Sequence, residues 1–168
     1  LFNSVFLKTF SLSSDITSYG KLFPKYAKRF IPIDNAVDHS VFFNKGFDRK
    51  KIILAVGRLE KQKDYPTLLT SFSEVLKKYS EYELNIVGSG QLKKDLLCLA
   101  SELGISGSVK FLGQLEQDDV ADLYNNADIF VLCSLWEGFP KVLLEAMNSG
   151  CKVVATRVDS IPRVLGPN

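Results

Sequence analysis

Two glutamates placed eight residues apart, Glu137 and Glu145, are the side chains with the clearest potential for chemistry. The first lies in a predicted loop after an apolar run, and the second falls in a helix that Pro140 should begin. Eight residues is a little over two helical turns, so the carboxylates would not share one simple helical face. We therefore expect them to flank the mouth of a strand-loop-helix unit. The helix N-terminus there would direct backbone N–H groups at an anion.

A basic loop elsewhere in the chain supplies the opposite charge. Arg58 and Lys63 follow the apolar run 52–56, and Gly57, directly before Arg58, would allow a ligand to approach the backbone closely. An arginine can bind two phosphate oxygens and a lysine adds a point charge. These residues also fit an ordinary solvated loop, and the glutamate pair also fits residues that serve the helix dipole. Their positions after buried strands favour an anionic ligand.

The elements that would position these residues alternate in strict order. Continuous apolar runs typical of buried parallel strands lie at 52–56, 84–87, 109–112, 129–133 and 152–155. Helical patterns lie between them at 66–79, 91–103, 118–126 and 140–148. This order predicts an α/β fold, a doubly wound parallel sheet of Rossmann-like type. Ligands of such sheets bind at the carboxyl ends of the strands, where the loops 57–58, 88–90, 113 and 136–140 should meet.

Periodicity also predicts which side chains are buried. The helix 66–79 should bury Leu68, Leu69, Phe72, Val75, Leu76 and Tyr79. The helix 91–103 should bury Leu92, Leu96, Leu97, Ala100 and Leu103. Towards the N-terminus we expect a strand around Phe6, Leu7 and Phe10, a helix over 16–28 and an edge strand over 28–33. The polar segment 44–50 is interpreted as a linker or flexible loop.

Composition narrows the class of protein. The 168 residues carry a net charge of +2, which gives no strong case for nucleic acid, and no apolar run approaches a membrane span. Three separated cysteines predict buried free thiols in a reducing compartment. The lone His39 fits a surface role, and no Asp-x-Asp motif indicates a metal-diphosphate site. Because the chain starts at Leu1, we expect a fragment, and the lack of a targeting segment carries little weight.

Six segments, in order, resemble one family: the donor-binding domain of retaining GT-B glycosyltransferases, family 4 or "glycosyl transferases group 1" type. They are Asn35-Ala36-Val37-Asp38, Gly57-Arg58-Leu59 with Lys63-Asp64, Val87-Gly88-Ser89-Gly90, Val109-Lys110-Phe111-Leu112-Gly113, Glu137-Gly138-Phe139-Pro140 with Glu145, and Gly150-Cys151-Lys152-Val153-Val154-Ala155-Thr156. The sequence departs from the family where Ala36 and Asp64 replace glycine, Lys152 replaces proline, and Arg163 replaces an acidic residue.

The resemblance implies a role for each site residue. Arg58, Lys63 and Glu137 would be catalytic: the two cations hold the leaving diphosphate, and the glutamate lies by the sugar. Glu145 would bind the ribose hydroxyls. The donor would also contact Gly57, Gly88, Gly90, Phe111, Leu112, Gly138, Phe139, Pro140, Lys141 and Val142. The implied reaction moves a sugar from a nucleotide-diphosphate sugar, UDP-sugar in preference to GDP-sugar, with retention of configuration and with no metal or other cofactor.

The resemblance further implies that part of the enzyme is absent from this chain. Residues 1–30 would be the tail of an acceptor domain, and 31–168 a donor domain truncated at its C-terminus. The missing half would bind a saccharide or lipid-linked acceptor and could associate peripherally with the inner face of a membrane, in the cytoplasm, in polysaccharide or lipopolysaccharide biosynthesis. The fragment alone would bind nucleotide weakly without transferring sugar. No nucleic-acid partner is implied.

Two other functions remain open from the residues. A nucleotide-sugar 2-epimerase shares the GT-B architecture, although the motif of Glu137 and Glu145 speaks against it. A non-catalytic nucleotide-binding module would also keep the fold, although the intact Arg58 and Lys63 argue against a decayed site. Incubation with UDP-N-acetylglucosamine separates epimerisation from transfer, and titration with UDP and GDP tests for nucleotide binding.

Overall fold

A computed structural model describes residues 9–11, 30–32 and 35–166, which fall into two compact units, Leu1–Ala36 and Val37–Asn168. In the first unit, strand β1 (Thr9–Ser11) pairs in parallel with β2 (Phe30–Pro32). The second strand lies within the range 28–33 predicted for an edge strand. The predicted helix 16–28 and the predicted strand residues Phe6 and Leu7 lie outside the described residues.

The second unit is built on a parallel sheet of five strands. In chain order they are β3 (Lys50–Val56), β4 (Glu83–Val87), β5 (Val109–Gly113), β6 (Ala127–Leu132) and β7 (Lys152–Ala155). Their order across the sheet is β5-β4-β3-β6-β7, and every neighbouring pair is parallel. The chain winds from β3 to one edge and then from β6 to the other. The predicted doubly wound Rossmann-like sheet is confirmed.

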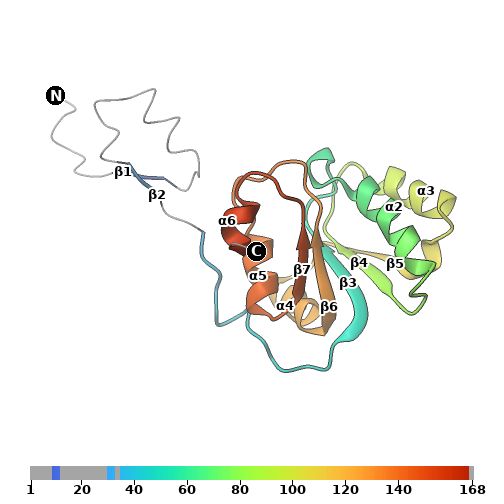
Figure 1. The fold of residues 1–168 in the computed structure, drawn as a ribbon, viewed down its shortest axis with the longest axis horizontal. Coiled ribbons are helices and arrows are strands. Elements are labelled where there is room, and N and C mark those ends of the chain that lie inside the picture. Colours follow the sequence, from blue (N-terminus) through green and yellow to red (C-terminus); the bar gives the residue numbers. More distant parts are fainter. Residues whose placement is uncertain (1–8, 12–29, 33–34, 167–168) are drawn as a thin grey trace. The chain divides into compact units, whose positions relative to one another are not determined.

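Helices cover both faces of this sheet (Figure 1). In chain order they are the short 3-10 helix η2 (Lys61–Lys63), α2 (Tyr65–Leu76), α3 (Lys93–Glu102), the 3-10 helix η3 (Ser106–Ser108), α4 (Gln117–Asn126), α5 (Lys141–Asn148) and α6 (Ile161–Leu165). Helices α2 and α3 lie on one face, and α4, α5 and α6 lie on the other.

Side chains of the central strand β3 belong to two separate hydrophobic clusters. Leu54 packs with Phe130 in the cluster under α4 and α5, whereas Ile53 and Ala55 pack with Phe72 in the cluster under α2 and α3. Successive side chains of a strand point to opposite faces, so a strand covered on both sides must be apolar throughout. This is why its sequence shows a continuous apolar run and no alternation.

Three predictions of burial are wrong at helix ends and edges. Helix α2 ends at Leu76, so Tyr79 lies beyond it with 54% of its surface exposed. In α3, Leu96 faces the sheet, and Leu97 lies about 100° further round the helix and is 47% exposed. Cys98 is exposed for the same reason. The three cysteines are free, as predicted, but only Cys151 is fully buried.

The segment 44–50, predicted to be a linker or flexible loop, is instead anchored to the second unit by hydrogen bonds. The backbone N–H of Lys45 donates to Asn125 Oδ1 at 2.7 Å. The Arg49 guanidinium donates to the carbonyls of Tyr124 and Ala127 at 2.7 Å each, and to that of Ser149 at 2.6 Å. These carbonyls lie at the ends of α4 and α5, where backbone acceptors lack a helical partner. A polar segment therefore serves as a clamp between two helices.

Candidate functional site

The glycine-containing loops at the carboxyl edge of the sheet pack directly on one another. The N–H of Leu59 donates to the carbonyl of Ser89 at 2.9 Å, and that of Gly88 donates to Gly113 at 2.7 Å. A Cβ added at Gly90 would lie 2.4 Å from the Leu59 carbonyl oxygen. The predicted convergence of these loops is therefore present, and the glycines serve close backbone packing between them.

Gly88 should tolerate no side chain. Its φ is +135°, and an added Cβ would lie 2.0 Å from the carbonyl oxygen of Gly57. Gly88→Ala should therefore lower the free energy of unfolding by about 2 kcal/mol or more, measured by urea denaturation. Gly107→Ala is the matched control, because nothing lies within 4 Å of a Cβ there. Equal stability of the two variants would contradict the packing described for this edge.

The first glutamate of the pair forms a buried charge cluster. Lys63 Nζ donates to Glu137 Oε1 in an ion pair whose side chains are 15% and 7% exposed. Ser134 Oγ donates to the same oxygen at 2.6 Å. The backbone N–H of Glu137 in turn donates to Asp159 Oδ2 at 2.7 Å. An ammonium has three donors, so Lys63 retains the capacity to donate to a further anionic oxygen.

Backbone contacts hold the basic loop and the glutamate loop together. Gln62 accepts from the N–H of Leu135 at 2.8 Å, and its side chain donates to the carbonyl of Trp136 at 2.8 Å. Burial raises the pKa of Cys133 to about 11, so its thiol stays protonated and donates to the Lys63 carbonyl at 3.3 Å. The sequence predicted that these loops lie at the same edge of the sheet, and the structure shows them in direct contact.

Arg58 differs from Lys63 in its surroundings. Its side chain is 70% exposed and pairs with Glu60 at 3.1 Å. An exposed pair of this kind contributes little to stability, so the guanidinium can change partner at small cost. The two predicted cations of the site are thus one buried, fixed charge and one exposed, movable charge.

The second glutamate lies in helix α5. Pro140 precedes the helix, whose N-terminus has no side-chain cap. Glu145 Oε2 accepts from the buried hydroxyl of Tyr124 at 3.2 Å, and that hydroxyl also lies 3.2 Å from the Val142 carbonyl. Burial raises the pKa of Glu145, and the hydrogen bond from Tyr124 and the charge of Lys141 partly oppose this.

The remaining predicted site residues separate into two groups. Gly138 and Lys141 are exposed at the mouth, where Phe139 is half-buried. Phe111 and Leu112, both predicted to contact the donor, pack in different clusters on opposite faces of β5. Because neighbouring strand residues point in opposite directions, their two side chains cannot contact one ligand from the same face.

Three of the four departures from the family pattern have a distinct local environment, and nothing in the structure explains Ala36. Asp64 adopts a left-handed conformation, with φ 45° and ψ 46°, in which glycine would be unstrained. The Arg163 guanidinium lies over the Phe139 ring, 5.5 Å from its centroid, in a cation–π contact. Lys152 donates to Asp128 at 2.8 Å at the amino end of the sheet, away from the site.

Sequence reasoning missed three side chains that contact the predicted site residues. Ser134 and Asp159 hold Glu137, and Tyr124 holds Glu145. Asp159 lies in the loop after the last predicted strand, and the rule for carboxyl ends of strands could have identified it. Tyr124 gave no separate signal, because a buried position in a helix accounts equally well for an aromatic residue.

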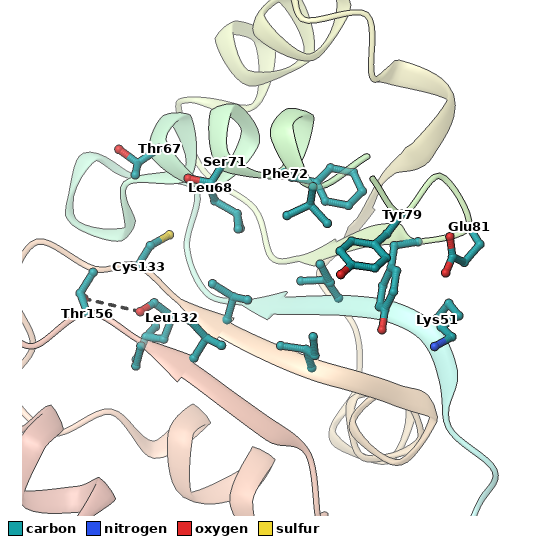
Figure 2. Close-up of a pocket in the computed structure, with 17 residues that line it drawn as sticks. Lys51, Thr67, Leu68, Ser71, Phe72, Tyr79, Glu81, Leu132, Cys133 and Thr156 are labelled. Atoms are coloured by element: carbon teal, nitrogen blue, oxygen red, sulfur yellow. Dashed lines mark hydrogen bonds between the residues drawn. The ribbon is translucent and has the colours of Figure 1, made fainter. Parts of the chain in front are cut away.

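A separate hollow, the apolar groove, runs along the face of the sheet beside α2 (Figure 2). Its volume is about 740 Å³, and its walls include Phe72, Ile129, Val131 and Val154. Apolar surface of this kind does not suit a phosphate group. The loops at the carboxyl edge, which carry Lys63 and Arg58, are therefore better suited to an anion than this groove is.

Two features are absent from the part of the chain that the structure describes. Within 9–11, 30–32 and 35–166, no group of three or more His, Cys, Asp or Glu side chains could hold a metal ion. Over the same residues, no helix has the length and apolar character needed to cross a bilayer.

Comparison with known proteins identifies the family. The glycosyl transferases group 1 profile matches residues 38–168. Mannosylfructose-phosphate synthase of Agrobacterium fabrum is 32% identical over 136 residues, which cover 76% of this chain and 30% of that protein. The C-terminal domain of the Francisella tularensis group 1 protein LpcC superposes with a TM-score of 0.69 at 25% identity, covering 79% of this chain and 76% of that one.

The fold is shared more widely among glycosyltransferases of GT-B architecture. Staphylococcus aureus TarM, solved in complex with UDP, superposes with a TM-score of 0.81 at 19% identity, covering 96% of this chain and 32% of that one. This chain spans about 30% of the length of the curated relatives it matches. With most of its residues inside the matched region, the chain belongs to the glycosyl transferases group 1 family.

Proposed function

We propose that this chain is the donor-binding domain of a retaining, metal-independent glycosyltransferase of family 4. It would bind a UDP-sugar in preference to a GDP-sugar, and the sugar would pass to a saccharide or lipid-linked acceptor. The observation that carries the proposal is the buried cluster of Lys63, Glu137 and Ser134 at the carboxyl edge of the sheet. Lys63 is held in place by Glu137, which lies three residues before Pro140 at the uncapped start of α5, and a fixed cation and a free helix N-terminus are both suited to a diphosphate.

The chemistry follows from where charge develops. Breaking the bond between sugar and diphosphate leaves negative charge on the departing phosphate and positive character on the sugar. Fixed cations and N–H groups aimed at the leaving group lower the barrier, because they need no rearrangement as the charge appears. Lys63 is held in place for this role, and the exposed Arg58 would add a bidentate contact. In this proposal Glu137 lies by the sugar and Glu145 binds the ribose.

Side chains would supply the charge that a divalent cation supplies in other enzymes. Two cationic residues and a helix N-terminus together offer enough positive potential for a diphosphate. We therefore infer that UDP binds equally well in the presence of Mg²⁺ and of EDTA. The argument rests on the basic groups at the site, Lys63 and Arg58.

The acceptor half belongs to the same proposal. In this proposal a separate acceptor-binding domain of the enzyme would bind the acceptor and could associate with the inner face of a membrane in the cytoplasm. Some relatives carry names that fit such a role, including N-acetylgalactosaminyltransferases of Campylobacter jejuni acting on undecaprenol-linked saccharides. The 168-residue chain alone would bind nucleotide weakly and would not transfer sugar.

The proposal is tested by titrating the 168-residue chain with UDP, GDP and uridine, following backbone amide signals by NMR. We expect UDP to shift amides of the loops around Gly57, Gly88 and Phe139, with weaker effects from GDP and uridine. Repeating the UDP titration in EDTA should leave the affinity unchanged. A chain that binds none of the three ligands, or that binds UDP only with Mg²⁺, would refute the proposal.

A further inference from the structure

Tyr124 carries a polar group into the centre of a hydrophobic cluster. Its side chain is fully buried, and its ring packs edge-on against Phe42 at 5.9 Å and Phe130 at 5.5 Å between centroids. A phenylalanine would make the same ring contacts without burying a hydroxyl. Burying a hydroxyl is costly unless it is hydrogen-bonded, so the acceptors of this hydroxyl require explanation.

Both acceptors belong to helix α5. The hydroxyl lies 3.2 Å from Glu145 Oε2 and 3.2 Å from the carbonyl oxygen of Val142. A phenol has one proton to donate, and a carboxylate is the stronger acceptor of the two. The hydroxyl therefore connects the rigid core to one oxygen of the Glu145 carboxylate.

The backbone of the two helices that make this contact is also held by Arg49. Arg49 Nη1 donates to the carbonyl of Tyr124, and Arg49 Nη2 donates to that of Ser149 at the C-terminal end of α5. One guanidinium therefore ties together the ends of the helices that carry the tyrosine and the glutamate. The separation of Tyr124 and Glu145 is set by this clamp as well as by packing.

We propose that Tyr124 is a positioning residue that orients the Glu145 carboxylate through Oε2 and leaves Oε1 to accept the ribose hydroxyls of the donor nucleotide. This inference rests on the proposed function, in which Glu145 contacts the ribose. Without the hydroxyl the carboxylate would turn about its side-chain torsions, and the ligand would have to restrict that freedom on binding.

Titration gives a readout that packing alone would not change. Burial raises the pKa of Glu145, and the Tyr124 hydrogen bond and the Lys141 charge lower it. Removing the hydroxyl takes away one of the lowering contributions, so the pKa should rise further. Ribose hydroxyls donate to the ionised carboxylate, so UDP affinity is lost as pH falls through the pKa of Glu145. In Tyr124→Phe this loss should occur at a higher pH than in the wild type.

The experiment compares Tyr124→Phe with Tyr82→Phe in the 168-residue chain. Tyr82 also donates to a carboxylate, Asp128 Oδ2 at 2.8 Å, at the amino end of the sheet. UDP affinity is measured by NMR over a pH series, with pyrophosphate as a ligand that lacks ribose. We expect Tyr124→Phe to weaken UDP binding about 3- to 10-fold, as for the loss of one hydrogen bond, and to leave the affinity for pyrophosphate unchanged. Tyr82→Phe should bind both ligands as the wild type does.

A second measurement follows the carboxyl carbon of Glu145 itself by NMR titration without ligand. Its midpoint should rise in Tyr124→Phe and stay unchanged in Tyr82→Phe. An unchanged midpoint and an unchanged UDP affinity in Tyr124→Phe would overturn this inference alone. A wild-type chain that does not bind UDP would overturn it together with the proposed function.

Discussion

Replacing Lys63 by alanine should weaken UDP binding to the 168-residue chain by about 10- to 100-fold, with no change in the binding of uridine. Hydrogen bonds to charged groups contribute about 1.5–3 kcal/mol each, and every 1.4 kcal/mol is a tenfold change in affinity. The Lys63 side chain is 15% exposed, so water screens its charge little. Uridine lacks the diphosphate, so its affinity should not change with the substitution.

The matched control is Lys61→Ala. Lys61 lies in the same 3-10 helix, η2, and is exposed to solvent. Both variants lose one positive charge from the same loop, so a general electrostatic effect would lower the affinity for UDP equally in the two. Calorimetric titration at moderate salt measures the affinities. Equal losses in the two variants, or a loss of uridine binding in Lys63→Ala, would argue against a specific diphosphate contact.

The second large effect concerns stability. Lys63→Met should lower the free energy of unfolding by about 2–4 kcal/mol, because it leaves the Glu137 carboxylate buried without its cation. The double variant Lys63→Met, Glu137→Gln should recover most of this loss. Its glutamine removes the unpaired charge and still accepts from Ser134 Oγ. Equilibrium urea denaturation of wild type, both single variants and the double variant gives the coupling energy between the two residues.

An exposed ion pair provides the comparison. Lys77 and Glu74 pair at 2.6 Å on the surface of the second unit, with side chains 66% and 65% exposed. Lys77→Met should change stability by less than about 1 kcal/mol. The interpretation of Lys63 and Glu137 as a buried, coupled pair would fail if the two substitutions were simply additive. It would also fail if Lys77→Met destabilised the chain to the same extent as Lys63→Met.

Much of the fold could be predicted because its signals are local. Strand β3 could be recognised from its continuous apolar run, because a strand covered on both faces needs apolar residues at every position. Leu54 and Ile53 are buried on opposite faces of the sheet. Predictions failed where a helix pattern continued past the buried stripe, as at Tyr79 and Leu97. Periodicity shows which face of a helix is apolar but gives no information on where the neighbouring element ends.

The candidate site likewise has a part that the sequence predicted and a part that only the tertiary structure shows. The sequence by itself determined the doubly wound order of elements, and with it the edge at which the loops of Lys63 and Glu137 meet, because parallel strands present their carboxyl ends together. Tertiary structure alone decided that Lys63 is buried on Glu137, and that Tyr124 in the core reaches Glu145. These contacts join residues 74 and 21 positions apart, and they depend on side-chain directions and burial that arise only when the helices pack on the sheet.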